Sequence, residues 1–548
     1  MRLREAFVLA VAMLGAVSFA PLCGALDEAT PFVPLGAVQD KHRASQLSPK
    51  ELLERLQGVE LDAANSFQVS ELYLRREAVR LTLRHGSLVF LEPVDGRVTG
   101  AVFEGAGEIL VLPPDLPERQ QMAKFTGSPI LAETFESLYL RFSEETYAAL
   151  REQLPARGKP RHAPEVLERW RGRVGELNGS HSVRLLLNLL SEKPAGYFYA
   201  SVTGERLGRF DAVVDERRAE RLLVGQIRAA GNEVFYDVWT SFSPGEQPPA
   251  EEPARGLAYR IDTTILPTYE LEATCEVDLE LADAHQQVLL FELSRRLTVE
   301  EVAEVSGEET QPLEFFQNAT LTAEEALHRG TDVLAVVLPA PHPSAKAEEP
   351  LSVSPASRLG AGPAGATRRL RFRYRGQVIT ALGNGVFFVG ARENWYPRLG
   401  AYVPAQYELR FRHPRRLELV ATGAREDPEA SGREAGEWKE SVWVSEGPVP
   451  IAGFNLGEYE SLSVDRGAVR VSVYGNRELE PMLLARVQRP TPPPQPRRRG
   501  SRLADVAPPT PTLLAPPSEQ AARMAEDVGR AVEVFSELFG PFPYSELK

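Results

Sequence analysis

The chain has 548 residues, which is too long for a single hydrophobic core, so several domains are expected. Hydrophobic residues make up 43% and charged residues 25%, and these fractions exclude a disordered or fibrous protein. The formal net charge of -14 gives no general affinity for nucleic acid or anionic lipid, so neither is expected as a partner.

The N-terminus, residues 1–25, has the pattern of an export signal. Arg2 and Arg4 supply positive charge, residues 6–20 are apolar and uncharged, and small residues from Cys23 onward precede a cleavage point. We therefore expect a periplasmic or extracellular protein. Two alternatives stay open: an uncleaved N-terminal anchor, for which the apolar run is short, and a lipoprotein attached through Cys23. The remaining sequence contains no stretch apolar enough to span a bilayer.

Residues 26–65 are predicted to contain one short helix, with Ser48 as N-cap and Pro49 at the first helical position. Residues 66–243 are predicted to form an α+β domain. Alternation with a period of two indicates its strands, and Asp95-Gly96 is typical of a hairpin turn. The predicted strands are 79–84, 87–92, 98–103, 109–112, 196–202, 210–214, 221–227 and 234–242. The stretch between about 143 and 191 is predicted to be mostly helical.

Residues 244–256 are rich in Pro and Glu and are predicted to be a linker. Residues 257–488 then contain many short strands separated by turn signals, which favours an antiparallel β-sandwich. The predicted strands are 269–281, 287–293, 333–338, 369–374, 385–389, 405–412, 416–422, 439–444, 449–456 and 468–474. We expect the first two of these to pair with each other. The predicted fold class is mainly β, a sandwich preceded by the α+β domain.

Two features of the sandwich have both a functional and a structural interpretation. Cys275 is either a nucleophile or a small core residue, and its place on the apolar side of an alternating strand favours the core. Once the export signal is removed it is the single cysteine, so no intrachain disulfide is expected. Trp395 and Tyr396 could line a ligand surface, but aromatic anchors of a core are favoured.

The C-terminal part begins with a Pro-rich linker, residues 489–517, and continues as a helix capped by Ser518 and stopped by Gly540. The helix carries one apolar stripe, formed by Met524, Val528, Val532, Phe535 and Leu538. We expect this lone helix to have nothing in the chain to pack on. Residues 518–548 are therefore interpreted as the start of a further domain.

No catalytic, cofactor-binding or metal-binding residue is predicted. A zinc hydrolase needs two His one helical turn apart with a carboxylate, as in His-Glu-x-x-His. No two of the eight His lie within five residues of each other; they are His42, His85, His162, His181, His285, His328, His342 and His413. The sequence also lacks a Gly-x-Ser-x-Gly elbow and a phosphate-binding loop. Gly383-Asn384-Gly385 is predicted to be a hairpin turn, not a dinucleotide fingerprint. Adjacent carboxylates such as Glu300 and Glu301 are interpreted as solvated faces.

Several short segments follow one another in a characteristic order in the second half of the chain. They are RID at 260–262, VLLFELSRRL at 288–297, LTVEEV at 297–302, LRFRYRG at 370–376, ENWYP at 393–397, YELRFRHP at 407–414, LVATG at 419–423, PIAGFNLG at 450–457 and FSELFGPFPY at 535–544. Their order is similar to the N-terminal region of zinc aminopeptidases of the alanyl aminopeptidase type, the gluzincins. The resemblance covers residues 257–548, about half of the chain.

The resemblance implies an aminopeptidase-like sandwich in front of a thermolysin-like catalytic domain. In the family, the motif that binds the substrate amine and the zinc-binding His-Glu-x-x-His lie downstream of the Phe-Pro turn at 539–544, and this sequence stops first. No catalytic or zinc residue is therefore carried over. Zinc is implied for the catalytic domain only, and the implied partners are that domain and peptides. The domain at 66–243 lies outside the standard family architecture and resembles extra domains of periplasmic relatives.

Three functional hypotheses follow. The leading one is the non-catalytic N-terminal part of a secreted aminopeptidase-like zinc metallopeptidase, which supports and shapes a downstream catalytic domain. The rival is a periplasmic binding or scaffolding protein without an enzymatic domain. A third is a degenerate enzyme homologue used as a scaffold. Because no local motif indicates a reaction, we predict no enzymatic activity from the 548 residues of this sequence alone.

We predict that the isolated chain holds no stoichiometric zinc and hydrolyses no aminoacyl anilide, because its dispersed His residues offer no local pair to begin a tetrahedral site. Metal analysis after dialysis and an anilide assay check this prediction. One tightly bound zinc per chain, or hydrolysis that a chelator abolishes, would show a site built from distant residues.

Overall fold

The computed structural model describes most of the chain from residue 47 onward. The described residues are 47–191, 194–218, 220–230, 233–245, 254–282, 286–317, 333–339, 367–391, 394–399, 403–426, 436–481 and 520–548. The predicted export signal, the Pro-rich linker at 489–517 and the predicted cap Ser518 lie outside them. Within these ranges, no helix combines the length and the apolar character that crossing a membrane requires.

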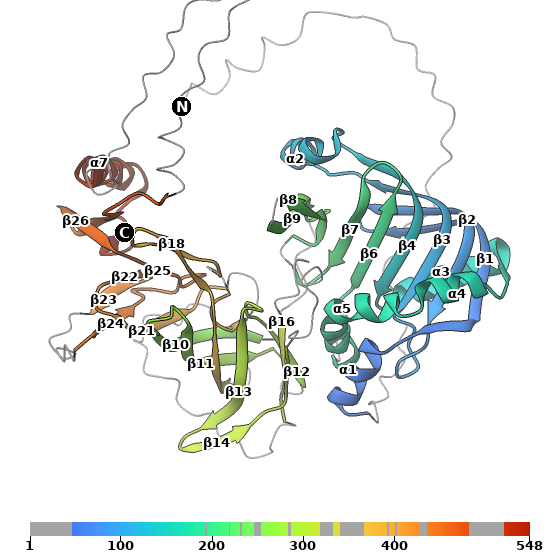
Figure 1. The fold of residues 1–548 in the computed structure, drawn as a ribbon, viewed down its shortest axis with the longest axis horizontal. Coiled ribbons are helices and arrows are strands. Elements are labelled where there is room, and N and C mark those ends of the chain that lie inside the picture. The colour runs from blue at the N-terminus through green and yellow to red at the C-terminus, as the bar shows by residue number, and fades with distance from the viewer. Residues whose placement is uncertain are drawn as a thin grey trace, which may run out of the picture. The chain divides into compact units, whose positions relative to one another are not determined.

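The first domain is built on one antiparallel sheet of nine strands (Figure 1, blue to green). Its strands are β1 (Leu61–Arg76), β2 (Val79–Leu91), β3 (Gly100–Val111), β4 (Leu131–Phe142), β5 (Gly158–Pro160), β6 (Tyr197–Gly204), β7 (Gly208–Asp215), β8 (Leu222–Ala230) and β9 (Glu233–Phe242). They lie in chain order except β5, which pairs with β1 at the edge. Tight turns join β1 to β2 and β6 to β7, since antiparallel neighbours need only a tight turn, whereas helices are inserted between β3 and β4 and between β4 and β6.

Helices pack against both faces of this sheet. They are α1 (Pro49–Gln57), α2 (Leu116–Thr126), α3 (Glu144–Arg157), α4 (Pro164–Trp170) and α5 (Arg173–Leu190). Met122 of α2 and Leu150 of α3 are buried with one set of strand side chains, whereas Leu56 of α1 and Leu186 of α5 are buried with the other set. The predicted helix start is confirmed, because the Ser48 side chain accepts a hydrogen bond from the Glu51 N–H in a capping box.

Two pairs of predicted strands are in fact single strands. Residues 79–92 were expected as two strands broken at His85-Gly86, and residues 98–112 as two strands broken near Gly105. The structure has continuous β2 and β3, because Gly86 lies opposite Gly105. A Cβ at Gly86 would lie 2.3 Å from the Glu104 carbonyl oxygen, so the missing side chains let the two backbones approach and bend together. Strands β1 and β4 and helix α2 were not predicted.

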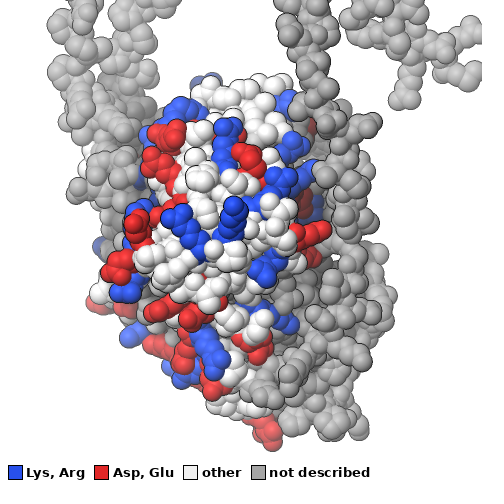
Figure 2. Space-filling model, turned by 90° about the vertical axis from the view of Figure 1, so that its right-hand side faces the viewer, with Lys and Arg blue, Asp and Glu red and all other residues white. Residues whose placement is uncertain are grey.

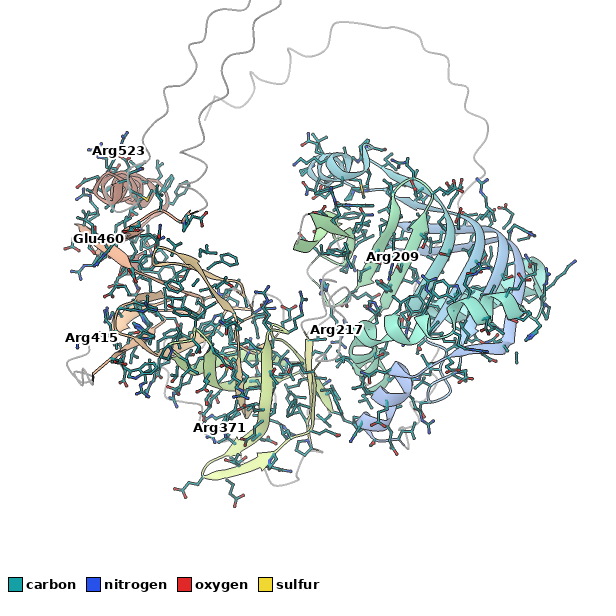
Figure 3. The ribbon with its side chains drawn as sticks, viewed as in Figure 1. Arg209, Arg217, Arg371, Arg415, Glu460 and Arg523 are labelled. Atoms are coloured by element: carbon teal, nitrogen blue, oxygen red, sulfur yellow. The ribbon has the colours of Figure 1, made fainter. Side chains whose placement is uncertain are left out.

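A layer of polar side chains is buried beneath α5. Arg184 donates to both carboxylate oxygens of Asp215, with Nε to Oδ2 at 2.8 Å. Burial alone would raise the pKa of Asp215, but the charge and hydrogen bonds of Arg184, together with Arg218 and the Arg217 N–H, hold that pKa below its ordinary value. Tyr199 donates to Asp211 at 2.8 Å on the same face. Figure 3 labels Arg209 of β7 and Arg217 just after it. The buried Arg184 and Asp215 thus form a closed ion pair, as burial requires.

The second domain contains one large sheet and several small ones. The large sheet has the order β14-β13-β17-β11-β10-β21-β24-β23. Its strands are β10 (Ala254–Ile265), β11 (Leu271–Leu281), β13 (Leu297–Ser306), β14 (Glu309–Pro312), β17 (Thr367–Gly376), β21 (Gln406–Pro414), β23 (Ala424–Glu426) and β24 (Trp438–Val444). The small sheets are formed by β12 (Val288–Glu292), β15 (Phe315–Gln317), β16 (Val333–Val337) and β20 (Arg398–Leu399), by β18 (Ile379–Gly383) with β19 (Val386–Val389), and by β22 (Glu418–Ala421) with β25 (Phe454–Gly457).

One expectation about pairing is corrected. The strand around Cys275, β11, was expected to pair with residues 287–293; it pairs with β10 and β17 instead, while β12 pairs with β16 and β20 in another sheet. The predicted mainly β fold is confirmed, and the large sheet is antiparallel except for the parallel pair of β10 and β21. A parallel pair needs a long crossover, and the 140 residues between Ile265 and Gln406 supply it.

The core of the sandwich lies between the large sheet and the small ones. Cys275 and Phe372 project from the large sheet, and Phe291 projects from β12; all three are fully buried. The rings of Phe291 and Phe372 meet edge to face with centroids 4.9 Å apart, so aromatic contact joins the two layers. Cys275 is therefore a core residue, and burial raises the pKa of its thiol, which keeps it protonated and unreactive.

The C-terminal helix α7 (Ala521–Phe539) is not without a partner. It packs on the hairpin of β26 (Tyr459–Arg466) and β27 (Val469–Asn476), whose sheet is completed by β28 (Glu546–Leu547). Of the predicted stripe, Val528 and Val532 contact the hairpin. Met524, Phe535 and Leu538 remain 54%, 59% and 68% exposed. The predicted stripe is thus only partly covered: Val528 and Val532 contact the hairpin, and the other three side chains are open to solvent.

Acid is predicted to destabilise the sandwich through His413, which is 1% exposed in β21. Burial lowers its pKa to about 4 from 6.5. Between these pH values the unfolded chain binds a proton that the folded chain does not, so stability is lost as the pH falls, by about 3 kcal/mol at pH 4. Calorimetry of His413→Gln should show a smaller fall in Tm between pH 7 and pH 4.5 than the parent chain. The exposed His85→Gln variant is the control; an equal pH dependence in all three proteins would contradict the prediction.

Candidate binding groove on the large sheet

The large sheet has one apolar and one polar face because successive side chains of a strand point in opposite directions. In β10, Ile261 and Ile265 are buried in the core, whereas Asp262 and Thr264 face outward. In β11, Cys275 lies inside and Glu272 lies outside. The same alternation in β17 and β21 places arginines on the outer face. The polar face is therefore a direct product of the pattern that builds the core.

Strand register aligns the outward residues into two rows across the sheet. The first row is Arg373, Thr274, Asp262, Arg410 and Val442. The second row, two residues further along each strand, is Arg375, Glu272, Thr264, Arg412 and Glu440. Because neighbouring strands lie about 4.8 Å apart, side chains in one row are close neighbours.

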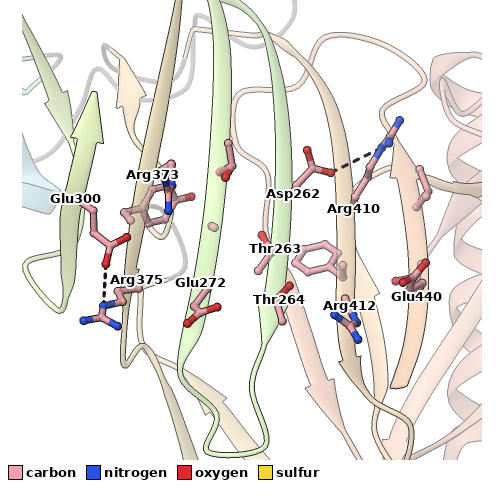
Figure 4. Close-up of a pocket in the computed structure, with 16 residues that line it drawn as sticks. Asp262, Thr263, Thr264, Glu272, Glu300, Arg373, Arg375, Arg410, Arg412 and Glu440 are labelled. Carbon is pink, nitrogen blue, oxygen red and sulfur yellow. Dashed lines mark ion pairs between the residues drawn. The ribbon is translucent and has the colours of Figure 1, made fainter. Parts of the chain in front are cut away.

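These rows line a groove of about 670 Å³ (Figure 4). Figure 4 shows the arginines of β17 on one side, those of β21 on the other, and Glu272, Thr263 and Thr264 between them. Glu300 of β13 and Glu440 of β24 complete the rim. The lining holds four carboxylates and four guanidiniums, so the groove suits a polar ligand that carries both charges.

Outside the groove, the same face of the sheet is a lattice of closed ion pairs. Arg371, labelled in Figure 3, donates to Glu276 at 2.7 Å, and Arg369 donates to Asp278 at 2.6 Å. At the β13 side, a β-bulge near Val299 exposes both Glu300 and Glu301. They pair with Arg375 at 3.0 Å and Arg373 at 3.3 Å. Glu300 and Glu301, which the sequence analysis interpreted as solvated residues, therefore each have an arginine partner. Both arginines also line the groove.

Inside the groove, the pairing is incomplete. Arg410 contacts Glu408 at 2.6 Å and Asp262 at 3.9 Å, and its pKa is raised, chiefly by the hydrogen bond to Glu408. Partial burial raises the pKa of Asp262. Arg412 lies over the ring of Trp438 at 4.6 Å and has no carboxylate partner among the described residues. Glu272 and Glu440 likewise have no ion pair within that part of the chain.

The sequence predicted no site residue, and it did not indicate this groove. The acidic side of the strand around Cys275 was visible from alternation, but the neighbours of that strand were not, so the rows could not be assembled. Trp395 and Tyr396 are confirmed as core residues: Trp395 donates to the Ala452 carbonyl at 2.9 Å, and the hydroxyls of Tyr396 and Tyr407 lie 3.1 Å apart. Among the described residues, no three His, Cys, Asp or Glu side chains come together in a way that could hold a metal ion.

Charged side chains elsewhere are mixed. Figure 2 shows one face of the molecule, on which Lys and Arg are interspersed with Asp and Glu and neither sign forms a continuous field. The groove differs from that face in how its charges are arranged: within the groove, the charged side chains of any one strand have the same sign.

No family model matches the chain, and no curated protein matches it. The chain is similar to solved structures of M1 zinc metallopeptidases. An enzyme from Deinococcus radiodurans is 16% identical, with a TM-score of 0.31 over 54% of this chain and 55% of that one. A point mutant of a D. radiodurans enzyme bound to a Tyr-Ser-Ala substrate is 15% identical, with a TM-score of 0.32 over 54% and 57%. A two-domain M1 mutant bound to L-arginine is 14% identical, with a TM-score of 0.32 over 55% and 57%. The chain thus spans little more than half the length of these structures.

Ion pairs on the large sheet are predicted to contribute to stability according to their burial. Asp278 is 5% exposed and accepts two hydrogen bonds from Arg369, so Arg369→Gln should lower the free energy of unfolding by about 2 kcal/mol. Arg373→Gln is the matched control on the same strand: its partner Glu301 is 44% exposed, and the cost should stay below about 1 kcal/mol. Denaturant unfolding measures both. Equal losses in the free energy of unfolding for the two variants would show that burial does not determine how much these ion pairs stabilise the sheet.

Proposed function

We propose that this chain is the non-catalytic N-terminal part of an exported aminopeptidase-like zinc metallopeptidase, in the periplasm or outside the cell. Its sandwich supports a catalytic domain and helps to shape the cleft that receives peptide substrates. The proposal rests on the ordered sequence segments and on how they contact one another.

Segments that are far apart in the sequence meet in one core. The indole N–H of Trp395, in ENWYP, donates to the carbonyl of Ala452, in PIAGFNLG. The strand of LVATG, β22, pairs with the strand of PIAGFNLG, β25, in the register Leu419 to Leu456. Tyr396 in turn reaches Tyr407, in YELRFRHP. The segments thus form one packing unit, which supports a common origin for their order.

The exposed apolar side chains of α7 are the observation that supports a catalytic domain as the partner. Phe535 and Leu538 belong to the last of the ordered segments and present large apolar side chains to solvent. Contiguous exposed apolar side chains on a helix mark an interaction surface. A catalytic domain that covers the exposed part of the stripe would bury them, which would account for large apolar side chains that the hairpin leaves uncovered.

Zinc, under this proposal, belongs to the catalytic domain. The described residues hold no group of His, Cys, Asp or Glu suited to the metal, so no step of zinc chemistry is assigned to them. The contribution of this chain is structural: it supplies a rigid sandwich and an apolar helix face.

The proposal predicts an in-frame His-Glu-x-x-His downstream of Lys548 in the encoding locus, and sequencing the locus tests it. In that longer product, Phe535→Asp should lower the free energy of unfolding by about 3 kcal/mol, because it places a carboxylate in an interface. In the present chain the same substitution is the control and should cost less than about 0.5 kcal/mol, since the side chain is exposed.

A stop codon directly after Lys548 would contradict the proposal and leave a binding or scaffolding protein as the function. Equal effects of Phe535→Asp in the two products would contradict the role of α7 while leaving the family relation intact.

A further inference from the structure

The groove on the large sheet carries its charges in bands that follow the strands. The bands are positive on β17, negative on β11 and β10, and positive on β21; their residues are Arg373 and Arg375, Glu272 and Asp262, and Arg410 and Arg412. Figure 4 shows the three bands side by side. The outer rims, with Glu300 and Glu440, are negative again. Such an order favours a ligand whose charges alternate along its length.

The charges of the groove are only partly paired: Arg373, Arg375 and Arg410 have carboxylate partners at exposed or partly exposed positions, whereas Arg412 and Glu272 form no ion pair among the described residues. Higher on the same sheet, Arg371 and Arg369 each close an ion pair with the neighbouring strand. In the groove, Arg412 stacks on Trp438 in place of a carboxylate, and Glu272 has no ionic partner within the described part of the chain. The stacked ring holds the guanidinium in one place, which lowers the entropy cost of binding an anion there.

The spacing of the bands matches an extended peptide. From β17 to β21 there are three strand spacings, about 14 Å in all. In an extended chain, residues i and i+4 lie on the same side and are also about 14 Å apart, with residue i+2 midway between them. The midpoint of the groove falls between Glu272 and Asp262.

We propose that this groove binds an extended peptide segment with acidic residues at i and i+4 and a basic residue at i+2. The acidic side chains meet the guanidiniums of β17 and β21, and the basic side chain meets the carboxylates of β11 and β10. Thr264 of β10 and Thr274 of β11, within the negative band, offer hydroxyls to the peptide backbone. This site lies within the large sheet and does not rest on the metallopeptidase proposal.

Fluorescence anisotropy with labelled pentapeptides tests the proposal on the full 548-residue chain. Glu-Ser-Lys-Ser-Glu should bind at least about fivefold more tightly than the inverted Lys-Ser-Glu-Ser-Lys at low salt. The net charge of -14 attracts the inverted, more basic peptide, so this preference runs against the long-range field of the protein. Local matching is then the single source of the preference.

Variants locate the site. Arg412→Gln should weaken the first peptide about fivefold, and Arg412→Glu should restore tight binding to Glu-Ser-Lys-Ser-Lys, whose changed end now meets a carboxylate. Arg255→Gln is the matched control, an exposed arginine of β10 outside the groove lining that pairs with Glu280. Equal affinity for the two original peptides, equal effects of Arg412→Gln and Arg255→Gln, or no binding of either peptide overturns the proposal.

Discussion

The register between β10 and β11 is the constraint on which the sandwich depends. It sets Ile261 opposite Cys275 in the core and Asp262 opposite Thr274 on the outer face. A slip of one residue would exchange the two faces, placing Asp262 against Phe372 and exposing Ile261 to water. Since burying an unpaired carboxylate costs several kcal/mol, this register is strongly preferred. The same pairing aligns the polar rows of the groove, so a change of register would alter the core and the groove together.

The local patterns of the sequence predicted many of the strands and the helices except α2, because alternation and capping are local properties. The Asp95-Gly96 turn and the Gly383-Asn384-Gly385 turn were predicted from turn chemistry, and the structure has Asp95 and Asn384 at positive φ. The prediction failed where a long-range partner decides the outcome. Gly86 looks like a strand break until Gly105 is known to lie opposite it. Likewise, the apolar pattern of β12 does not say which sheet it joins.

The groove could not be predicted for a related reason. Alternation within each strand indicates which of its residues point outward. Arg375, Glu272 and Arg412 become neighbours, however, only when β17, β11 and β21 share one sheet. In sequence they are scattered over more than a hundred positions. Charge pairs across strands leave no mark that distinguishes them from solvated surface charge. Interactions between distant strands therefore limit sequence reasoning more than the identity of each strand does.

The C-terminal helix α7 is held by a small contact. Ala521, Ala525 and Gly529 let it approach the hairpin of β26 and β27 closely, but small side chains remove little apolar area from water. Arg466 adds ion pairs to Glu526 and to Glu533, the latter at 3.5 Å, at partly exposed positions that contribute modestly. The large apolar side chains of the same stripe, Phe535 and Leu538, remain exposed beyond the contact with the hairpin. Most of the apolar area of the helix is thus unburied, so its contact with the hairpin contributes little hydrophobic stabilisation.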